Sequence, residues 1–598
     1  MKAVPCFVFL ALHLTNWPNT LALGAEAGIS NCDQAALRAA LGSGGTVTFE
    51  CDGTLTLSNT LHITQDTVLD ARGRRVTLSG EKRVRVIHVD PGVSLTLLDL
   101  TIAFGQSTNG GGIYNEGGNV TLVNCVLATN SASGASGHAD SAADGLGGAV
   151  FNSGWLTISN CTLRANIARG AAGRLGTHGV DAQDITDQFN RCRTVSPPGS
   201  GGPGGVGGNG LGGGIFNVGT ALVVNTSIEL NQALGGVGGA GGDTGRGGCT
   251  SGCGLIKGGD GAVGGRAAGG GLHSSGILTL FNSTFADNGT TGGAGGKGGE
   301  ASCVMIIPPG QAGSGGAASG AAICNVGTLT GTNVTLAQNR VVGGDGGLSG
   351  GYGVFYPCPV FPNGLGGEAH GGAVFSDGAT IFANATIWNN EVVGGSGTNR
   401  FATSCTGYAG TNGLAVAASL HVAGGTFLLA HTVVGNLASA TNCAGPISDG
   451  GHNLASDGSA AFMAPGSLND TDPKLGPLTD QGGPTRTLAL LPGSPAIDAG
   501  DDLTCPPADQ RGVPRPQGAH CDIGAFEQTF LSIRQSADGL VHLEYHGVPA
   551  RAYVLEASFD LRTWSPAETN SASGNGVVSF GQINPAGSAS RFFRAVLP

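Results

Sequence analysis

The sequence carries little charge, since lysine, arginine, aspartate and glutamate make up only 11% of its 598 residues. The net charge is −12, and the basic residues form few clusters. Proteins that bind nucleic acid concentrate positive charge against the phosphates. The composition therefore predicts no nucleic-acid partner and disfavours binding to an anionic membrane surface.

Long apolar runs are also missing. Beyond the N-terminus there is no stretch of about eighteen apolar residues, the length that a membrane-spanning helix requires. The N-terminus itself resembles a secretory signal, with Lys2, a short apolar segment over 3–14 and a small-x-small site at Ala25-Glu26-Ala27. We expect residues 1–27 to be a signal peptide and the mature chain to be secreted or held at the cell surface, without an integral membrane segment.

Glycine is abundant, with 112 residues, but it shows no strict Gly-X-Y period of the collagen kind. Low charge and high glycine are typical of disordered, low-complexity chains. An in-phase repeat argues against disorder here, because it places apolar residues at fixed positions.

The repeat is a unit of about twenty residues that occurs seven times. Its last residue is asparagine in every copy: Asn130, Asn166, Asn231, Asn288, Asn339, Asn390 and Asn436. Twelve positions earlier stands glycine: Gly118, Gly154, Gly219, Gly276, Gly327, Gly378 and Gly424. Six positions earlier the seventh copy has Ala430, and the other six copies have asparagine: Asn124, Asn160, Asn225, Asn282, Asn333 and Asn384. Three positions earlier the residue is apolar: Leu127, Leu163, Ile228, Phe285, Leu336, Ile387 and Val433.

Apolar and polar residues alternate within each copy, as around Leu156 and Ile158, and a period of two indicates strands. The glycine separates two short strands, where we expect a corner with positive φ. Stacked coils bury their inner faces only together, and the stacking places asparagine over asparagine. The sequence predicts an all-β fold, a right-handed parallel β-helix, with hydrogen-bonded asparagine ladders.

Residues 33–43 are expected to form a short amphipathic helix, with Leu37 and Leu41 on one face and glycines after it. Such a helix can cover the exposed first coil of a solenoid. Alternating segments within 46–106 are expected to form the first coils.

Fourteen cysteines remain after the signal, which fits an oxidising compartment. Cys32 and Cys51 flank the first strands, and Cys505 and Cys521 bracket a proline-rich loop. Seven lie between repeats and are expected to be mostly oxidised: Cys192, Cys249, Cys253, Cys303, Cys358, Cys405 and Cys443. Cys125, Cys161 and Cys324 lie inside units and are expected to be buried thiols. Cys249 and Cys253 lack a second ligand pair at zinc-like spacing, so disulfides are favoured over a metal site.

The chain between units varies in length, and every insertion follows the terminal asparagine. We therefore expect all insertions to leave the solenoid along one edge. Several contain runs of Gly-Gly-x, which are either floppy linkers or extended glycine helices packed on one another and tied by the loop cysteines; we favour partial order. One insertion concentrates aromatic residues that are candidates for binding a glycan or a protein partner: Tyr352, Phe355, Tyr356 and Phe361. Deletion of 344–366 is expected to weaken binding and to leave thermal unfolding nearly unchanged.

Two motifs carry a family resemblance. Gly148-Ala149-Val150 followed by Leu163-Arg164-Ala165-Asn166 resembles the repeat of bacterial polymorphic outer membrane proteins. The segments Asp472–Leu478, Leu491–Gly500, Asp509–Gly512 and Cys521–Glu527 together resemble the choice-of-anchor Q domain. That resemblance implies a secreted β-helix of the pectin-lyase type, with the Q-like region at 440–528 of a 28–528 domain. No membrane-spanning anchor follows it.

Residues 529–598 have less glycine and more aromatic and β-branched residues, and they resemble a small β-sandwich module of secreted bacterial proteins. The module is expected either to stabilise the last coil or to serve export and surface retention.

Catalytic motifs are sparse. Of the short motifs expected in a galacturonan hydrolase of this fold, only Asp501-Asp502 is present, and acids do not recur in phase. His273 and His421 share one repeat position with Tyr and Phe, so we expect stacked structural residues. Asp498, Asp509, Arg511 and Asp522 are expected to form a buried ion-pair network.

We predict no catalytic residue, no metal and no cofactor. The favoured hypothesis is a structural or adhesive surface protein that binds a polysaccharide or cell-surface partner through its insertion edge. The alternatives are a polysaccharide lyase or hydrolase with a divergent site, and a passive scaffold.

Overall fold

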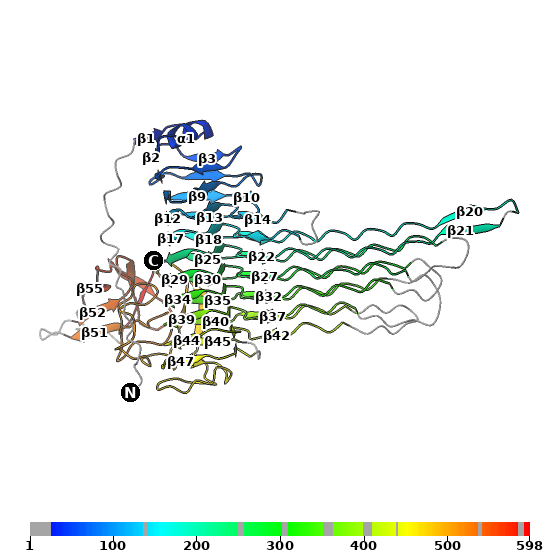
Figure 1. Cartoon of the computed structure of the whole chain (residues 1–598). Coiled ribbons are helices and arrows are strands. Elements are labelled where there is room, and N and C mark those ends of the chain that lie inside the picture. The colour runs from blue at the N-terminus through cyan, green and yellow to red at the C-terminus, as the bar shows by residue number, and fades with distance from the viewer. Residues whose placement is uncertain are drawn as a thin grey trace, which may run out of the picture.

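The computed structural model describes residues 26–135, 142–189, 191–247, 256–301, 309–350, 363–398, 410–437, 441–535, 541–583 and 591–598. The chain winds into a parallel β-helix, with a long flat arm projecting from one edge of the coils (Figure 1). The predicted all-β parallel solenoid is confirmed. The proposed signal lies almost wholly outside the described residues. Within them, no helix is long and apolar enough to cross a membrane.

Three parallel sheets of 12, 11 and 10 strands form the solenoid. Sheet A consists of β1 (Glu26–Ile29), β2 (Gly45–Phe49), β5 (Thr67–Asp70), β8 (Ser94–Leu98), β12 (Asn119–Val123), β17 (Trp155–Ser159), β24 (Thr220–Val224), β29 (Ile277–Phe281), β34 (Thr328–Thr332), β39 (Ala379–Ala383), β44 (Phe427–Ala430) and β47 (Ser448–Asp449). Sheet B consists of β3 (Gly53–Thr56), β6 (Val76–Ser79), β9 (Leu100–Ala103), β13 (Val126–Ala128), β18 (Thr162–Arg164), β25 (Ser227–Glu229), β30 (Thr284–Ala286), β35 (Thr335–Ala337), β40 (Thr386–Trp388), β45 (Val433–Gly435) and β48 (Leu454–Ala455). Sheet C consists of β4 (Leu61–Ile63), β7 (Ile87–Val89), β11 (Ile113–Asn115), β16 (Val150–Asn152), β23 (Ile215–Asn217), β28 (Leu272–Ser274), β33 (Ile323–Asn325), β38 (Val374–Ser376), β43 (Leu420–Val422) and β46 (Cys443–Ala444).

Two narrower sheets form the root of the arm, where each insertion leaves and re-enters a coil. Sheet D consists of β10 (Gln106–Ser107), β14 (Ser131–Ser133), β19 (Ile167–Arg169), β26 (Gln232–Leu234), β31 (Gly289–Thr291), β36 (Arg340–Val342) and β41 (Glu391–Val393). Sheet E consists of β15 (Gly145–Leu146), β22 (Gly210–Leu211), β27 (Ala267–Ala268), β32 (Ala318–Ser319), β37 (Ala369–His370) and β42 (Ala415–Val416). The predicted single insertion edge is therefore the edge between sheets D and E.

The core of the solenoid contains the apolar repeat positions. Leu163 on β18 pairs with Leu127 on one side and Ile228 on the other, and all three side chains are fully buried. The seventh copy departs from the sequence alignment, because Ile387 pairs with Val434 and not with Val433. One extra residue after β43 shifts the register, so Val433 instead packs in a separate cluster on the outside of sheet B.

Six of the seven terminal asparagines form the predicted ladder, whereas Asn436 donates to the backbone carbonyl of Asn390. From Asn130 to Asn390, each Nδ2 donates to Oδ1 of the next asparagine at 2.9–3.1 Å. All six are buried, so the ladder supplies the hydrogen bonds that buried amides need. The second set of asparagines, six positions before the terminal asparagine, occupies the left-handed region of the backbone, with φ between 49° and 55°. In the seventh copy His431, with φ 49°, takes this corner in place of Ala430.

The aligned glycines serve a purpose other than the predicted one. None of Gly154, Gly219 and Gly276 has positive φ. A Cβ on Gly154 would instead lie 2.2 Å from the carbonyl oxygen of Gly118 on the preceding coil. These glycines are required because the backbones stack too closely for a side chain. Positive φ, between 54° and 66°, occurs at the start of each unit, as at Gly147 and Gly320.

The first coil carries α1 (Gln34–Leu41), which Asp33 caps through a 2.8 Å hydrogen bond from the Ala36 amide. Leu37 is fully buried in the solenoid core, as predicted. A disulfide joins Cys32 to Cys51, and a second joins Cys505 to Cys521.

The predicted buried thiols Cys125, Cys161 and Cys324 are free and buried. Cys443, expected among the oxidised loop cysteines, is also free and buried, because it lies on β46 inside the last coils and not in a loop. Cys192 is disulfide-bonded. Cys249, Cys253, Cys303, Cys358 and Cys405 lie outside the described residues.

After the coils, the chain folds back along the outer face of sheet B. The antiparallel hairpin β49 (Leu475–Thr479) and β50 (Thr487–Leu490) packs Leu478 and Leu488 against outward residues of β30, β35 and β40. Further along, Gln510 bonds to Thr284 and Thr335 on successive coils, and the amide of Ala525 donates to Thr386. We call residues 470–527 the flank segment.

The C-terminal module is a small sandwich of two antiparallel sheets, as predicted. One contains β51 (Leu531–Gln535), β52 (Val541–His546) and β55 (Val577–Ile583), and the other contains β54 (Ser565–Ser571), β53 (Ala552–Ser558) and β56 (Phe592–Val596). Both sheets contribute to its core, as Leu543 and Leu555 do. The module contacts the flank segment, where Arg551 Nε donates to the Gly482 carbonyl at 2.8 Å. It therefore lies beside the coils (Figure 1).

Candidate functional site

The sequence-predicted binding residues Tyr352, Phe355, Tyr356 and Phe361 lie outside the described residues. The described chain on either side of them, 343–350 and 363–368, belongs to the arm. The arm is therefore the candidate binding surface, and its construction determines what it can present.

Ten extended legs form the arm (Figure 1), two for each of five coils. The outgoing legs are 170–182, 235–247, 292–301, 343–350 and 394–398, and the returning legs are 199–209, 256–266, 309–317, 363–368 and 410–414. Backbone amides donate to neighbouring legs at every third residue, as Gly173 does to Val237, Gly176 to Ala240 and Gly179 to Asp243. A three-residue period without internal hydrogen bonds is the polyproline II conformation. The predicted packing of extended glycine helices is confirmed for these legs.

The Gly-Gly-x pattern follows from this packing. A Cβ on Gly238 would lie 2.0 Å from the Ala262 carbonyl oxygen, and one on Gly239 would lie 1.8 Å from that of Arg174. Only the third residue of the triplet, Ala240, points away from other legs. The uppermost leg, 170–182, has neighbours on fewer sides and accordingly keeps only one glycine in three, as in Gly173-Arg174-Leu175.

This packing gives a sharp prediction for Gly239→Ala. The added methyl group cannot be accommodated without separating legs, so amide hydrogen exchange should accelerate across 170–182, 199–209 and 235–247. The solenoid core is remote, and its unfolding midpoint should stay unchanged. Ala240→Val, one residue further on the outward position, is the matched control and should leave exchange as in the wild type. Equal protection in both variants would contradict the close packing.

The outward positions of the arm carry many aliphatic side chains. On the outgoing legs Leu175 and Val237 are 73% and 50% exposed, and on the returning legs Val263 and Leu365 are 46% and 49% exposed. Charged residues alternate with them, as Lys297 and Glu300 do in a 2.6 Å ion pair. The described legs therefore present a mixed aliphatic and charged outward surface.

The hairpin β20 (Gln183–Thr186) and β21 (Cys192–Ser196) belongs to the second insertion, which follows Asn166, and it extends beyond the other legs (Figure 1). It exposes Ile185, Phe189 and Val195, at 54%, 68% and 59%. The Arg191 guanidinium lies 5.5 Å from the Phe189 ring centroid. We call these three apolar residues the tip cluster.

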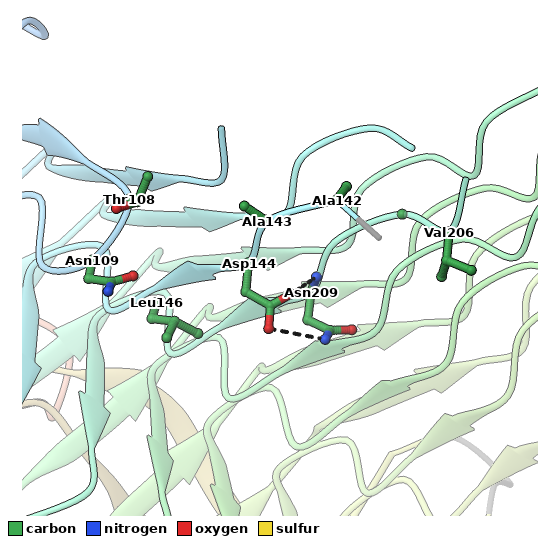
Figure 2. A pocket seen from close by; sticks show the side chains of 9 residues that line it. Thr108, Asn109, Ala142, Ala143, Asp144, Leu146, Val206 and Asn209 are labelled. Carbon is green, nitrogen blue, oxygen red and sulfur yellow. Dashed lines mark hydrogen bonds between the residues drawn. The ribbon is translucent and has the colours of Figure 1, made fainter. Parts of the chain in front are cut away.

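A hollow of about 620 Å³ lies at the root of the arm, between β10, the strand β15 and the first returning leg (Figure 2). Its lining residues are Thr108, Asn109, Ala142, Ala143, Asp144, Leu146, Val206, Gly207 and Asn209. The one carboxylate among them, Asp144, accepts hydrogen bonds from the backbone amide and side-chain Nδ2 of Asn209 at 2.6 and 3.3 Å. An acid–base mechanism of glycoside cleavage needs two carboxyl groups across the bond, and the described lining contains one.

A row of rings runs along the outer face of sheet C. His62, His88, Tyr114, Phe151, Phe216 and His273 follow one another with centroids 4.8–5.4 Å apart. The rings from Tyr114 to His273 lie within 21° of parallel, so they cover each other's faces and leave none for a sugar. Burial lowers the pKa of His273 to about 4. The predicted stacking is confirmed for His273, which lies parallel to Phe216. His421 instead meets the Phe375 ring edge-on, at 83° and 5.4 Å, so stacking is not what holds it.

The flank segment holds part of the predicted ion-pair network; the Asp498 side chain is only half-buried and accepts from the His520 amide. Arg511 pairs with Asp509 at 2.7 Å, and both side chains are buried. Asp522 joins it by accepting from the Asp498 amide at 2.8 Å. Sequence reasoning missed Arg515 and Glu527, which are also buried and lie 3.6 Å apart. Burial raises the pKa of Asp522 to about 6 and that of Glu527 to about 7.

His431 and His452 stack at 5.2 Å beneath the loop that carries Cys505. The Asp501 amide donates to His431 Nε2 at 3.0 Å, and burial lowers the pKa of His431 to about 4. His452 Nδ1 lies 2.7 Å from the Ala499 carbonyl oxygen. These histidines hold the loop against the coils.

Sequence reasoning also missed a cluster on the first coils. His88 Nε2 lies 2.9 Å from Glu116 Oε2 and 3.7 Å from Asp90 Oδ1. His88 and Asp90 lie on the coil before the first aligned unit, and Glu116 lies within that unit. The signal was present in the register of β7 with β11, since both acids stand two positions after the ring row.

The chain matches no protein-family model and no curated protein sequence. The parallel β-helix is therefore established by the structure alone, and the resemblance to the choice-of-anchor Q domain stays a prediction.

Proposed function

We propose that the protein is a non-catalytic binding protein of the adhesive kind, secreted or held at the cell surface, and that the arm is its recognition surface. The observation that carries this proposal is the arm itself: an ordered, hydrogen-bonded plate that contributes nothing to the solenoid core and exposes aliphatic side chains on both faces. Loops on a rigid framework are where recognition usually lies.

The class of partner follows from the chemistry of the plate. On the described legs the outward side chains are aliphatic residues interspersed with small polar ones and with charged ones of both signs, as Lys297 and Glu300 are. An extended polysaccharide or a cell-surface protein suits such a surface. Residues 352–361 add aromatic side chains to one insertion, and we propose that they belong to the same surface.

The polysaccharide lyase or hydrolase alternative gains no specific support from the described part of the chain. Asp509, Asp522 and Glu527 of the flank segment are buried, and Asp144 in the hollow is bonded to Asn209. We further propose that residues 1–27 direct export, that the Q-like region spans 440–528, and that the module at 529–598 serves surface retention.

The test is a glycan-array and cell-binding screen of the purified mature chain, repeated with Ile185→Ser, Phe189→Ser and Val195→Ser combined. We expect this tip-cluster variant to lose at least about tenfold in affinity for any captured partner, because exposed apolar anchors dominate such contacts. Its thermal unfolding should match the wild type, because none of the three side chains is buried. Leu503→Ser, at a 91% exposed residue of the flank segment, is the matched control.

A second variant for the same screen replaces 351–362 by a short glycine-serine linker. This deletion is narrower than 344–366, because the legs on either side of 351–362 are hydrogen-bonded into the plate. The amides of Gly344 and Gly347 donate to Gly316 and Gly313 of the adjacent leg. The amides of Gly364 and Gly367 donate in turn to Gly347 and Gly344. Removing those legs would leave a gap in the plate and alter unfolding. Unchanged binding in both the tip-cluster and the linker variants would refute the arm as the recognition surface.

A further inference from the structure

We propose that His88, Asp90 and Glu116 form a divalent-metal site, suited to Zn²⁺, that links two successive coils near the N-terminal end of the solenoid. The inference concerns a region remote from the arm and does not depend on the proposed recognition function.

The ligand atoms already converge. One atom from each residue lies within 4.8 Å of the other two, and His88 Nε2 is the nearest partner of both carboxylates. An ion bound at about 2.0–2.2 Å from each atom needs ligand separations of this order. The two carboxylates are partly exposed, at 37% and 49%, so they can adjust toward an ion from the solvent side.

The histidine is held in place by its neighbours. Its ring lies between His62 on the preceding coil and Tyr114 on the following coil, with centroids 4.8 and 5.0 Å away. Its side chain is only 17% exposed. Fixed orientation of a ligating imidazole lowers the cost of binding a metal, and the row of rings supplies that orientation.

The backbone fixes the two carboxylates as well. The Asp90 amide donates to the Ile63 carbonyl and the Glu116 amide to the Val89 carbonyl, at 3.1 and 3.0 Å, so both acids leave the coil at equivalent positions of neighbouring strands. Two negative carboxylates placed together repel one another unless a cation lies between them. Arg85, which lies three residues before His88, is committed elsewhere: its guanidinium lies 4.6 Å from the Tyr114 ring and donates to Ser107 and Asn109.

The donor set selects the metal. One imidazole nitrogen and two carboxylate oxygens are ligands that Zn²⁺ accepts in a four-coordinate site with a water molecule. Ca²⁺ and Mg²⁺ prefer oxygen ligands alone, in larger numbers. The ion would join Asp90 and His88 of one coil to Glu116 of the next, as an additional link between coils whose other contacts are the sheets.

The experiment is isothermal titration of the EDTA-treated mature chain with ZnCl₂, alongside Co²⁺ titration followed by visible absorption. We expect one site per chain, tetrahedral Co²⁺ bands, and a higher unfolding temperature with Zn²⁺. His88→Gln and Glu116→Gln should each weaken Zn²⁺ binding at least about tenfold, because loss of even an outer partner costs that much. CaCl₂ should bind more weakly than ZnCl₂.

The matched control is His178→Gln. His178 lies on the arm, 3.7 Å from the single carboxylate of Asp243, and its loss should leave the Zn²⁺ isotherm unchanged. Should His88→Gln disturb folding, Glu116→Gln, which changes a half-exposed side chain, still decides the question. The proposal is overturned if the wild type binds no Zn²⁺, if Glu116→Gln binds it as tightly as the wild type, or if Ca²⁺ binds this site more tightly.

Discussion

Leu163→Asp is expected to lower the free energy of unfolding by more than about 4 kcal/mol, because it places a carboxylate in a fully buried position. Leu163 lies in the middle of sheet B, with Leu127 and Ile228 stacked directly on either side. In a solenoid each coil contacts only its neighbours, so the defect should also divide the coils into two cooperative units. Guanidinium unfolding followed by far-ultraviolet circular dichroism would show a lowered midpoint and a second transition.

The control for this prediction is Trp155→Asp on the same coil. Trp155 is 65% exposed on β17, so the same new charge stays in water and should cost less than about 1 kcal/mol. Leu163→Ala, which leaves a cavity without a charge, should lie between them at about 2–5 kcal/mol. A Leu163→Asp protein that unfolds like the wild type would show that the register of the coils is wrong.

Arg515→Leu is expected to cost about 3–5 kcal/mol at pH 8, because it leaves buried carboxyl groups without their cation. Arg515 pairs with Glu527 at 3.6 Å and donates to the carbonyl oxygens of Asp522 and Gly524 at 2.6 and 2.7 Å. Its side chain is 1% exposed, so water cannot replace these contacts.

The cost should depend on pH in a defined direction. Burial raises the pKa of Glu527 to about 7 and that of Asp522 to about 6, so the folded state favours their protonated forms. The stability that this preference contributes is complete below the ordinary carboxyl pKa of about 4 and is lost as the pH rises through 6 to 7. Arg515 limits that loss, because its positive charge stabilises the ionised carboxylates. Arg515→Leu should therefore lower the free energy of unfolding less at pH 5 than at pH 8.

Trp388 provides the readout, because it packs against Leu478 and Leu488 of the flank segment. Urea unfolding followed by tryptophan fluorescence at both pH values measures the difference. The matched control is Arg340→Leu, which removes a 2.8 Å ion pair with Glu391 that is more than half exposed. Such surface pairs contribute about 1 kcal/mol or less. An equal cost for Arg515→Leu at pH 5 and pH 8 would show that the carboxyl groups are not its cause.

The sequence by itself determined the parallel coils, because their periodicity is local. Leu163, Asn166 and their equivalents repeat in phase, and a stack is the arrangement that buries the apolar positions and pairs the amides of the asparagines together. The Gly-Gly-x pattern in the insertions indicated packed glycine helices, and this signal is also local. Two of every three residues must lack a side chain only where two faces of a leg lie against the backbone of other legs.

The tertiary structure decided everything that depends on which coil lies beside which segment. One extra residue after β43 moved the seventh copy by one position and placed His431 at a corner. The flank segment runs back along sheet B to reach Thr284, a partner more than two hundred positions away, and no repeat pattern encodes that contact. Arg515 and Glu527 have no periodic signal, because they meet only after the flank has folded onto the coils. His88, Asp90 and Glu116 meet only after the coils have stacked, and their one signal in the sequence is that each acid stands two positions after a ring residue.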